Sequence, residues 1–344
     1  MNRPTIADLA QAAGVSVSTV NRILAGAASV RQTTIQRVRD AADEIGFYGL
    51  TTIEDRNRNA MPHYRLGFLL QQSTRELYRL FAHKIQEACE RRRDEIVDPA
   101  IEFVDDLAPE NIATRLRLLG ATCDAVALIA ADHPLIGQAI QDLKSAGTPV
   151  VSYITDQSSP DRAGYVGTDN WKLGRTAAWF IGQTTHGPGR VALFIGNHRY
   201  QCQDIADASF RSYIRENAPH LTVDDSRPTH EEPEQAYRIV STLLAEARDL
   251  VGIYIAGGGI SGVLRALREI PEDKRRTVRL ICRDIGPETR KGLAEGLITA
   301  ALCHPLEETS DQLVQTMLDA IDQQGNGLIL QRSIPFEIIT PENL

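Results

Sequence analysis

Three glycines in the stretch IAGGGISG, residues 255–262, have the spacing of a phosphate-binding loop. Gly257, Gly259 and Gly262 fit the pattern G-x-G-x-x-G, in which missing side chains let backbone amides approach a dinucleotide pyrophosphate. Asp284 ends the next apolar run, where a dinucleotide-binding domain has a carboxylate that binds the ribose. These residues raise the hypothesis of an NAD-dependent dehydrogenase.

The place of this loop in the chain argues against that hypothesis. Dinucleotide domains commonly carry the glycine pattern in their first strand–helix–strand unit, whereas many apolar runs precede it here. No obvious acid or base for hydride transfer stands nearby. A lone glycine pattern is also a frequent false positive. We therefore keep the dehydrogenase as the alternative, and expect a protein that is not an enzyme and has no cofactor.

Other apolar runs also end in polar loops, and these loops supply candidate residues for binding a small polar molecule. Loops at the carboxyl ends of parallel strands gather at one edge of a sheet, which is where ligands bind in open α/β folds. The loop after VALFIG suits a sugar, because it combines hydrogen-bonding groups with an aromatic ring. The candidates are Asp284, Asp169, His198, Arg199, Tyr200, Gln72, Tyr78, Asp132, His133 and Gly258.

Some of these candidates have equally ordinary structural interpretations. A lone aromatic residue such as Tyr78 usually packs in a core. Asp132 and His133 precede a predicted helix, and capping of that helix is the favoured interpretation of both. Residues 198–200 are also compatible with a surface loop. Trp171 and Trp179 are expected in the core.

Cysteine and histidine spacing does not predict a metal site. The cysteines are odd in number, widely spaced and without a C-x-x-C pair, so we expect reduced and mostly buried side chains. The histidines are similarly dispersed. The five cysteines are Cys89, Cys123, Cys202, Cys282 and Cys303.

Basic residues are concentrated at the N-terminus of an otherwise acidic chain. The net charge is −8, yet residues 1–39 hold five arginines against one acidic residue, Asp8. This asymmetry predicts a small phosphate-facing module attached to an acidic body.

The first 48 residues predict three short helices. Thr5 can cap the first helix together with Asp8, and Gly14 ends it. The second helix, in VSVSTVNRILAG, has apolar residues on one side and short polar residues with Arg22 on the other. A third helix follows in TTIQRVRDAADEIGF. Two helices joined by a tight turn, with a third that closes the core, form a helix-turn-helix, although an ordinary three-helix bundle remains the alternative.

The rest of the chain alternates apolar runs with helical stretches, which predicts an α/β fold with parallel sheets. The runs are too many for one comfortable open sheet, so we expect two lobes with a ligand cleft between them. The expected boundaries are a headpiece at 1–48, a linker at 49–62 and a two-lobed domain at 63–344, with lobe 1 about 63–162 and 292–324 and lobe 2 about 163–291 and 325–344. No run approaches the roughly 18 apolar residues of a membrane span, and the amino terminus does not resemble a signal peptide, so we expect no membrane partner and a cytoplasmic location.

The stretches TIADLAQAAGVSVSTVNRILAG and TTIQRVRDAADEIGF resemble the DNA-binding headpiece of the lac repressor family. The α/β remainder resembles that family's periplasmic-binding-protein-like (type I) effector domain. The resemblance implies base-reading positions at Val17, Ser18 and Arg22. It also implies phosphate contacts from Ser16, Thr19, Asn21, Arg31 and Thr34. In the effector domain it matches Asp284 to an aspartate that binds sugar hydroxyls, and places Asp169 in a D-N-x-x-x-G-like loop.

Three positions depart from the family pattern. Arg56 stands where many members insert a hinge leucine into the minor groove. Arg31 replaces the usual serine cap of the third helix, and Asp204 stands where some members have a sugar-binding arginine. The chain shows no heptad tail, so a homodimer is the expected assembly.

The leading hypothesis is a ligand-responsive transcription regulator, a repressor that binds near-palindromic double-stranded operator DNA. Its effector is expected to be a sugar or polyol held between the lobes. The operator sequence and the sign of the response do not follow from the sequence. A free binding protein with an added helical bundle is disfavoured by the basic headpiece.

Overall fold

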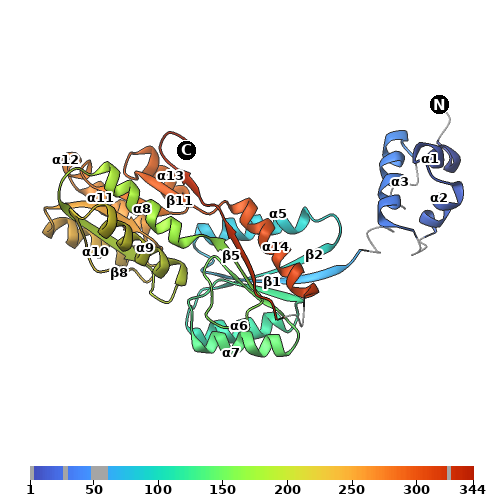
Figure 1. The fold of residues 1–344 in the computed structure, drawn as a ribbon, viewed down its shortest axis with the longest axis horizontal. Coiled ribbons are helices and arrows are strands. Elements are labelled where there is room, and N and C mark those ends of the chain that lie inside the picture. The colour runs from blue at the N-terminus through green and yellow to red at the C-terminus, as the bar shows by residue number, and fades with distance from the viewer. Residues whose placement is uncertain (1–3, 26–29, 48–60, 324–326) are drawn as a thin grey trace. The chain divides into compact units, whose positions relative to one another are not determined.

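The computed structural model describes residues 4–25, 30–47, 61–323 and 327–344. These residues form a helical headpiece up to residue 47 and an α/β unit from residue 61 (Figure 1). Most of the predicted linker, including Arg56, lies outside the described residues.

The headpiece contains the three predicted helices, α1 (Ile6–Ala12), α2 (Val17–Leu24) and α3 (Gln32–Ile45). The predicted capping box is present, because the Asp8 amide donates to the Thr5 hydroxyl and the Thr5 amide donates to the Asp8 carboxylate. Gly14 has a φ of +62°, a left-handed conformation that glycine adopts without strain and that ends α1.

One apolar core holds these three helices together. Leu9, Val20 and Val38 are each fully buried and come from α1, α2 and α3 respectively. Burial of an aliphatic side chain of this size contributes about 1.5–3 kcal/mol. The apolar stripe predicted for each helix therefore faces this core, and the polar side of α2 faces outward.

The first sheet of the α/β unit has the order β12-β5-β4-β3-β1-β2, and the strand pairs from β12 to β1 are parallel. Its helices α6 and α7 cover one face, and α5 and α14 cover the other (Figure 1). We call this layer lobe 1. Its strands are β1 (His63–Gln71), β2 (Ile96–Val104), β3 (Ala125–Leu128), β4 (Val150–Tyr153), β5 (Gly164–Thr168) and β12 (Leu330–Ile334), and its helices are α5 (Glu76–Glu90), α6 (Pro109–Gly120), α7 (Pro134–Ser145) and α14 (Leu306–Asp322).

The second sheet has the order β13-β11-β10-β9-β6-β7, with β8 also paired to β6. Helices α8 and α9 pack on one face, and α10, α11 and α13 pack on the other. We call this layer lobe 2. Its strands are β6 (Gly189–Ile195), β7 (Leu221–Val223), β8 (Arg227–Pro228), β9 (Leu250–Ile255), β10 (Arg279–Arg283), β11 (Ala300–Cys303) and β13 (Glu337–Ile339), and its helices are α8 (Asn170–Thr184), α9 (Gln201–Asn217), α10 (Pro233–Glu246), α11 (Ile260–Glu269), α12 (Glu272–Arg275) and α13 (Pro287–Ala294).

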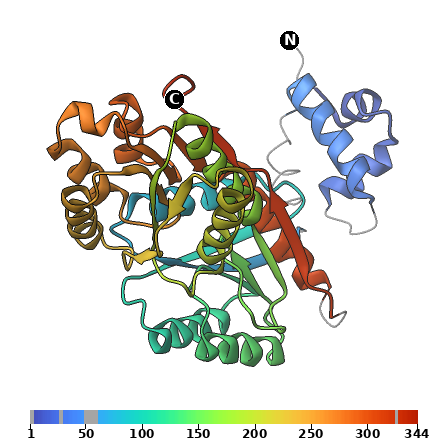
Figure 2. The ribbon, with the colours of Figure 1, turned by 60° about the vertical axis from the view of Figure 1, so that its left-hand side comes forward.

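The chain passes between the lobes after β5, after β11 and after β12. The expected lobe boundaries were displaced at each passage: β5 belongs to lobe 1, α13 and β11 belong to lobe 2, and β12 returns to lobe 1. Figure 2 shows β12, in red, along the edge of the first sheet beside β5. The displacement arises because adjacent apolar runs have similar compositions, so only strand pairing decides which sheet each run joins.

The cysteine and tryptophan side chains differ in their burial. The five cysteines are buried, as expected. Trp171 and Trp179, expected in the core, are instead 48% and 46% exposed on α8. The buried face of this helix is formed by small and aliphatic residues such as Leu173, Ala177 and Ile181. Among the described residues, no helix is long and apolar enough to span a membrane.

The close crossing of α8 and α9 depends on Gly174, and this generates a stability prediction. A Cβ atom at Gly174 would collide with the backbone carbonyl of Ala206, whereas one at Gly182 of the same helix would make only ordinary contact with Ala218. We expect Gly174→Ala to destabilise the protein by about 1–3 kcal/mol. Gly182→Ala, the matched control, should be neutral or stabilise by up to about 1 kcal/mol through helix propensity. Urea unfolding of both variants tests this, and equal effects would contradict it.

Candidate effector cleft and DNA-binding face

A cavity of about 500 Å³ lies between the two lobes of the α/β unit. Lobe 1 contributes the start of α5 together with Ile129, Ile154 and Thr155. Lobe 2 contributes loops at the carboxyl ends of its strands, including the glycine-rich loop after β9. Among the sequence candidates, Asp284, Tyr200, Tyr78 and Gly258 line this cavity.

Asp284, His304 and Arg283 form a hydrogen-bonded chain in the cleft. The Asp284 carboxylate accepts from the backbone amide of His304 at 3.0 Å and lies 2.6 Å from His304 Nδ1. On its other side, His304 Nε2 lies 2.9 Å from Arg283 Nη2. Because a guanidinium can only donate, Nε2 is the acceptor, and we assign the proton to Nδ1, which donates to Asp284. His304 therefore links the Asp284 carboxylate to the Arg283 guanidinium.

Asp284 is held in its ionised form. Burial alone would raise the pKa of this carboxyl group, but His304 and Arg283 outweigh burial and hold the pKa well below its ordinary value. Asp284 also has a φ of +59°, an uncommon backbone conformation outside glycine that ends β10 and turns the chain toward α13. The cleft therefore contains a fixed hydrogen-bond acceptor.

An ion pair crosses the cleft between the lobes. Arg75, which precedes α5 in lobe 1, places Nη1 2.6 Å from Glu231 Oε2 of lobe 2. Glu231 also accepts from the side-chain amide of Gln203 at 2.9 Å. His230 and Glu231 have φ values of +53° and +63°, so two consecutive residues other than glycine are left-handed. Such conformations cost of order 1–3 kcal/mol each and are commonly found at functional sites.

The glycines of IAGGGISG are explained by close packing. A Cβ atom at Gly258 would meet the Glu231 carboxylate, and one at Gly257 would lie 2.5 Å from the Gly196 amide. A Cβ atom at Gly262 would collide with the Pro233 carbonyl, which lets α10 and α11 approach closely. These three glycines are thus required by contacts within the protein, and no dinucleotide is needed to explain them.

Two tyrosines close another side of the cleft. The Tyr78 hydroxyl of lobe 1 and the Tyr200 hydroxyl of lobe 2 both donate to Gln71 Oε1, at 2.9 and 3.0 Å. Burial raises the pKa of both phenols, so they are neutral donors. Tyr78 is therefore buried, as expected for a core aromatic residue, and it also lines the cleft.

The other effector candidates lie outside this cavity. The Asp169 side chain caps α8 by accepting from the Lys172 amide, and Gln72 accepts from Arg75. His198 is 58% exposed and contacts Asp204, which is equally exposed. For Asp169 the reason is local, because a short polar side chain at a strand end can satisfy a free backbone amide of the helix that follows.

Asp132, His133 and Arg199 line a different hollow of about 410 Å³. His133 Nδ1 accepts from the Leu135 amide and caps α7, as the favoured interpretation predicted, whereas Asp132 accepts from the Ser158 amide. The Arg199 carbonyl accepts from the Asp132 amide and so joins the two lobes.

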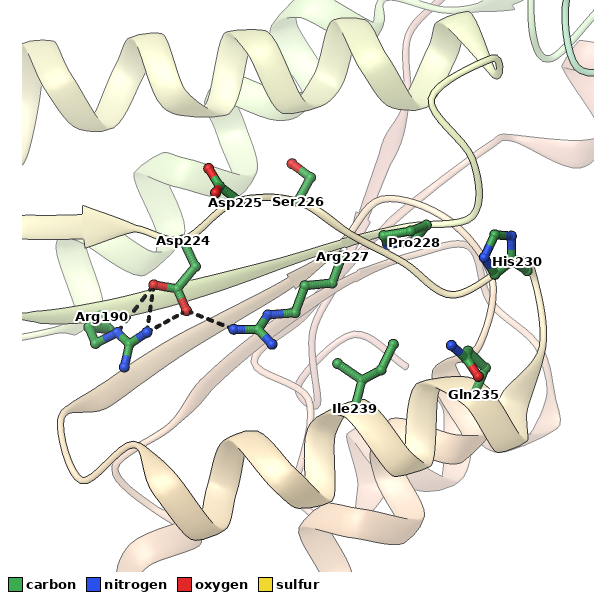
Figure 3. Close-up of a pocket in the computed structure, with 9 residues that line it drawn as sticks. All are labelled: Arg190, Asp224, Asp225, Ser226, Arg227, Pro228, His230, Gln235 and Ile239. Carbon is green, nitrogen blue, oxygen red and sulfur yellow. Dashed lines mark hydrogen bonds and ion pairs between the residues drawn. The ribbon is translucent and has the colours of Figure 1, made fainter.

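A further hollow of about 490 Å³ lies on lobe 2 beside α10. Figure 3 shows Arg190 and Arg227 converging on the carboxylate of Asp224. This carboxylate already pairs with both guanidinium groups, so these charges at the hollow compensate one another. Among the described residues, no group of three or more histidine, cysteine, aspartate or glutamate side chains could hold a metal ion.

Several cleft residues were not among the sequence candidates: Arg75, Gln203, Glu231, Arg283 and His304. A signal existed for Arg283 and His304, because each lies in a polar loop at a strand end, RDIG and CHP. Glu231 had no such signal, because its carboxylate reaches the cleft only through the left-handed turn at His230 and Glu231.

The headpiece presents the second candidate site, on the outer face of α2. Val17 is 45% exposed, and Ser18, Asn21 and Arg22 are also exposed. Ser16 caps α2 by accepting from the Thr19 amide, while its hydroxyl lies 2.8 Å from the Thr19 hydroxyl. Arg31 makes no side-chain cap for α3, and Thr34 lies half-buried in that helix's first turn. A helix face with short polar side chains and an exposed arginine suits the major groove.

Comparisons with protein families identify both parts. A family model described as bacterial regulatory proteins, lacI family, matches residues 5–49, and a model described as periplasmic binding protein domain matches residues 67–326. The transcriptional regulator GalR of Streptococcus thermophilus is 33% identical over 35% of each chain. The regulator GntR of Pseudomonas aeruginosa is 51% identical over 13% of each chain. The alignments thus span about a third or less of these relatives.

Solved structures share the fold of the α/β unit. GanP, a glucose-galactose binding protein from Geobacillus stearothermophilus, has a TM-score of 0.73 at 19% identity, covering 82% of this chain and 99% of that one. A solute binding protein from Agrobacterium vitis, bound with tagatopyranose, has a TM-score of 0.73 at 17% identity, covering 81% and 95%. The predicted two-lobed α/β architecture is confirmed.

The depressed pKa of Asp284 generates a prediction about acid stability. The contribution of this carboxylate is present above the ordinary carboxyl pKa of 3.8 and is lost as pH falls toward its lower folded-state pKa. Asp284→Asn should lower the unfolding free energy by about 1.5–3 kcal/mol at pH 7, and the difference should shrink below pH of about 4. Asp169→Asn, which preserves a helix cap, is the control and should have little effect. A difference that stays constant between pH 7 and 3 would contradict this.

Proposed function

Because the chain belongs to the lacI family of bacterial regulatory proteins and its residues 67–326 form a periplasmic binding protein domain, we propose that it is a sequence-specific DNA-binding transcription regulator. It acts as a repressor whose operator affinity is set by a small polar effector in the cleft. The exposed face of α2, with Arg22 on a rigid three-helix core, is the observation that carries the DNA-binding part.

The DNA partner is a near-palindromic operator bound by a homodimer. Val17, Ser18 and Arg22 read base edges, since a guanidinium pairs with guanine and an apolar side chain contacts the thymine methyl group. Ser16, Thr19, Asn21, Arg31 and Thr34 contact phosphates and fix the position of the helix. Two-fold symmetry of the protein is then matched by symmetry of the DNA. With DNA as its target, the protein works in the cytoplasm.

The effector of this proposal is a sugar or polyol. Support comes from the tyrosine rings, the fixed acceptor Asp284 and the donors around it, which together suit a ligand rich in hydroxyl groups. GanP and the tagatopyranose-bound protein are structural neighbours named for sugars. The effector acts by linkage: it favours one arrangement of the lobes, and that arrangement binds operator with a different affinity. The dehydrogenase alternative has no support from the family matches, and contacts within the protein account for the glycines of the loop.

Selection of DNA from a random pool tests the proposed function. The full-length protein should enrich a near-palindromic sequence whose half-sites are related by two-fold symmetry. A cleft ligand should then change the dissociation constant for that sequence by about 5- to 150-fold, measured by fluorescence anisotropy at fixed salt. Enrichment of no sequence would refute the operator part, whereas an enriched operator that responds to no ligand would refute only the effector part.

Arg22 provides a sharper test of base reading. Arg22→Ala should relax the base preference at one position per half-site and cost about 1–3 kcal/mol per contact on the selected DNA. Arg37→Ala removes the same charge from the exposed side of α3 and is the matched control, which should leave base preference intact. If Arg22→Ala weakens binding equally on all sequences, Arg22 contacts only phosphate.

A further inference from the structure

Several helices begin at the effector cleft without a side-chain cap. Residues at the N-termini of α5, α10, α11 and α13 line the cavity, and α14 starts two residues after His304, which also lines it. None of these five helices has a side-chain hydrogen bond at its N-cap. Each helix start carries a partial positive charge.

The acidic residues in the first turns neutralise this potential only in part. Glu76 of α5 and Glu288 of α13 are about half exposed, at 50% and 48%, and pair with Arg79 and Arg268 at the rim. Of the helices that begin away from the cavity, α7 and α8 are capped by His133 and Asp169, whereas α6 has no side-chain cap. The cleft is nevertheless the place where several uncapped helix starts lie together.

Arg283 adds a buried cation to the same cavity. Its side chain is only 8% exposed and lines the cleft. Its guanidinium bonds to neutral groups, His304 Nε2 at 2.9 Å and Asn170 Oδ1 at 3.4 Å, and its Nε has no hydrogen-bond partner. No carboxylate of the described residues lies within ion-pair distance of it, since Asp284 is bonded to His304 instead. A buried guanidinium is costly without a directly bonded anion.

We propose that the effector is a sugar acid, a polyhydroxylated ligand whose carboxylate bonds to Arg283. The planar carboxylate matches the donor fork of a guanidinium, and the surrounding helix ends favour a negative charge. Among the other charged groups of the cleft, Arg75 already pairs with Glu231. Asp284 is then left as an acceptor for the ligand hydroxyls. This inference rests on the proposed effector function and narrows its ligand class.

Matched ligands test the charge without altering the protein. Each set contains a sugar acid, its amide, the neutral aldose and the alditol, for example gluconate, gluconamide, glucose and glucitol, with galactonate and glucuronate sets beside it. Thermal shift and titration calorimetry on the full chain should show one acid binding, and its amide, aldose and alditol binding about 10- to 100-fold more weakly. Glucose 6-phosphate and 6-phosphogluconate complete the panel, so that a phosphate is distinguished from a carboxylate.

Variants of Arg283 test whether this residue recognises the ligand carboxylate. Arg283→Gln should abolish the preference for the acid over its amide, and Arg283→Lys should restore part of it, because lysine keeps the charge but not the fork. Arg190→Gln removes a guanidinium outside the cleft, in the ion-pair cluster of Figure 3, and should keep the preference of the wild type. If Arg283→Gln fails to fold, the acid and amide comparison on the wild-type chain still decides the question.

The outcomes separate this inference from the proposed function. Equal affinity for an acid and its neutral relatives overturns the sugar-acid assignment while leaving a sugar-responsive regulator intact. A phosphate ester that binds more tightly than every carboxylate also overturns it. Binding of no compound in the panel overturns both the assignment and the sugar effector, and operator selection then stands as the separate test of DNA binding.

Discussion

The hydrogen-bonded chain from Asp284 through His304 to Arg283 is the interaction on which the effector unit depends. Asp284 and Arg283 end one strand of lobe 2, and His304 begins the second passage of the chain between the lobes. His304 also lies 3.4 Å from the Thr168 hydroxyl at the first passage. One buried network therefore fixes the ends of two strands and two interlobe connections, so a ligand that contacts it acts where the lobes are joined.

The glycine-rich loop illustrates how one local pattern serves different chemistry in different surroundings. In a dinucleotide enzyme such glycines make room for a pyrophosphate, whereas here they make room for the Glu231 carboxylate and for the close approach of two helices. Glu231 in turn reaches Arg75 in the opposite lobe. The same backbone feature thus supports contact between lobes instead of a cofactor.

The sequence by itself determined the headpiece, because its signals are local. The capping residues Thr5 and Asp8, the left-handed Gly14 and the apolar spacing from Leu9 to Val38 act within a few residues or within one short bundle. The α/β class and the two lobes followed for a related reason, since the alternation of strand and helix is itself a sequence pattern. Asp284 was identified because it ends a strand, and ends of parallel strands gather.

Only the tertiary structure decided which strand joins which lobe and which polar residues meet in the cleft. Strand pairing is a long-range choice among similar apolar runs, so β5, β11 and β12 could not be assigned from composition. His133 and Asp169, which the sequence offered as effector-binding candidates, cap helices instead. Arg75 and Glu231, which are 156 residues apart, form an ion pair across the cleft. Local hydrogen bonds are encoded by neighbouring residues, whereas a contact between lobes exists only once both sheets have formed.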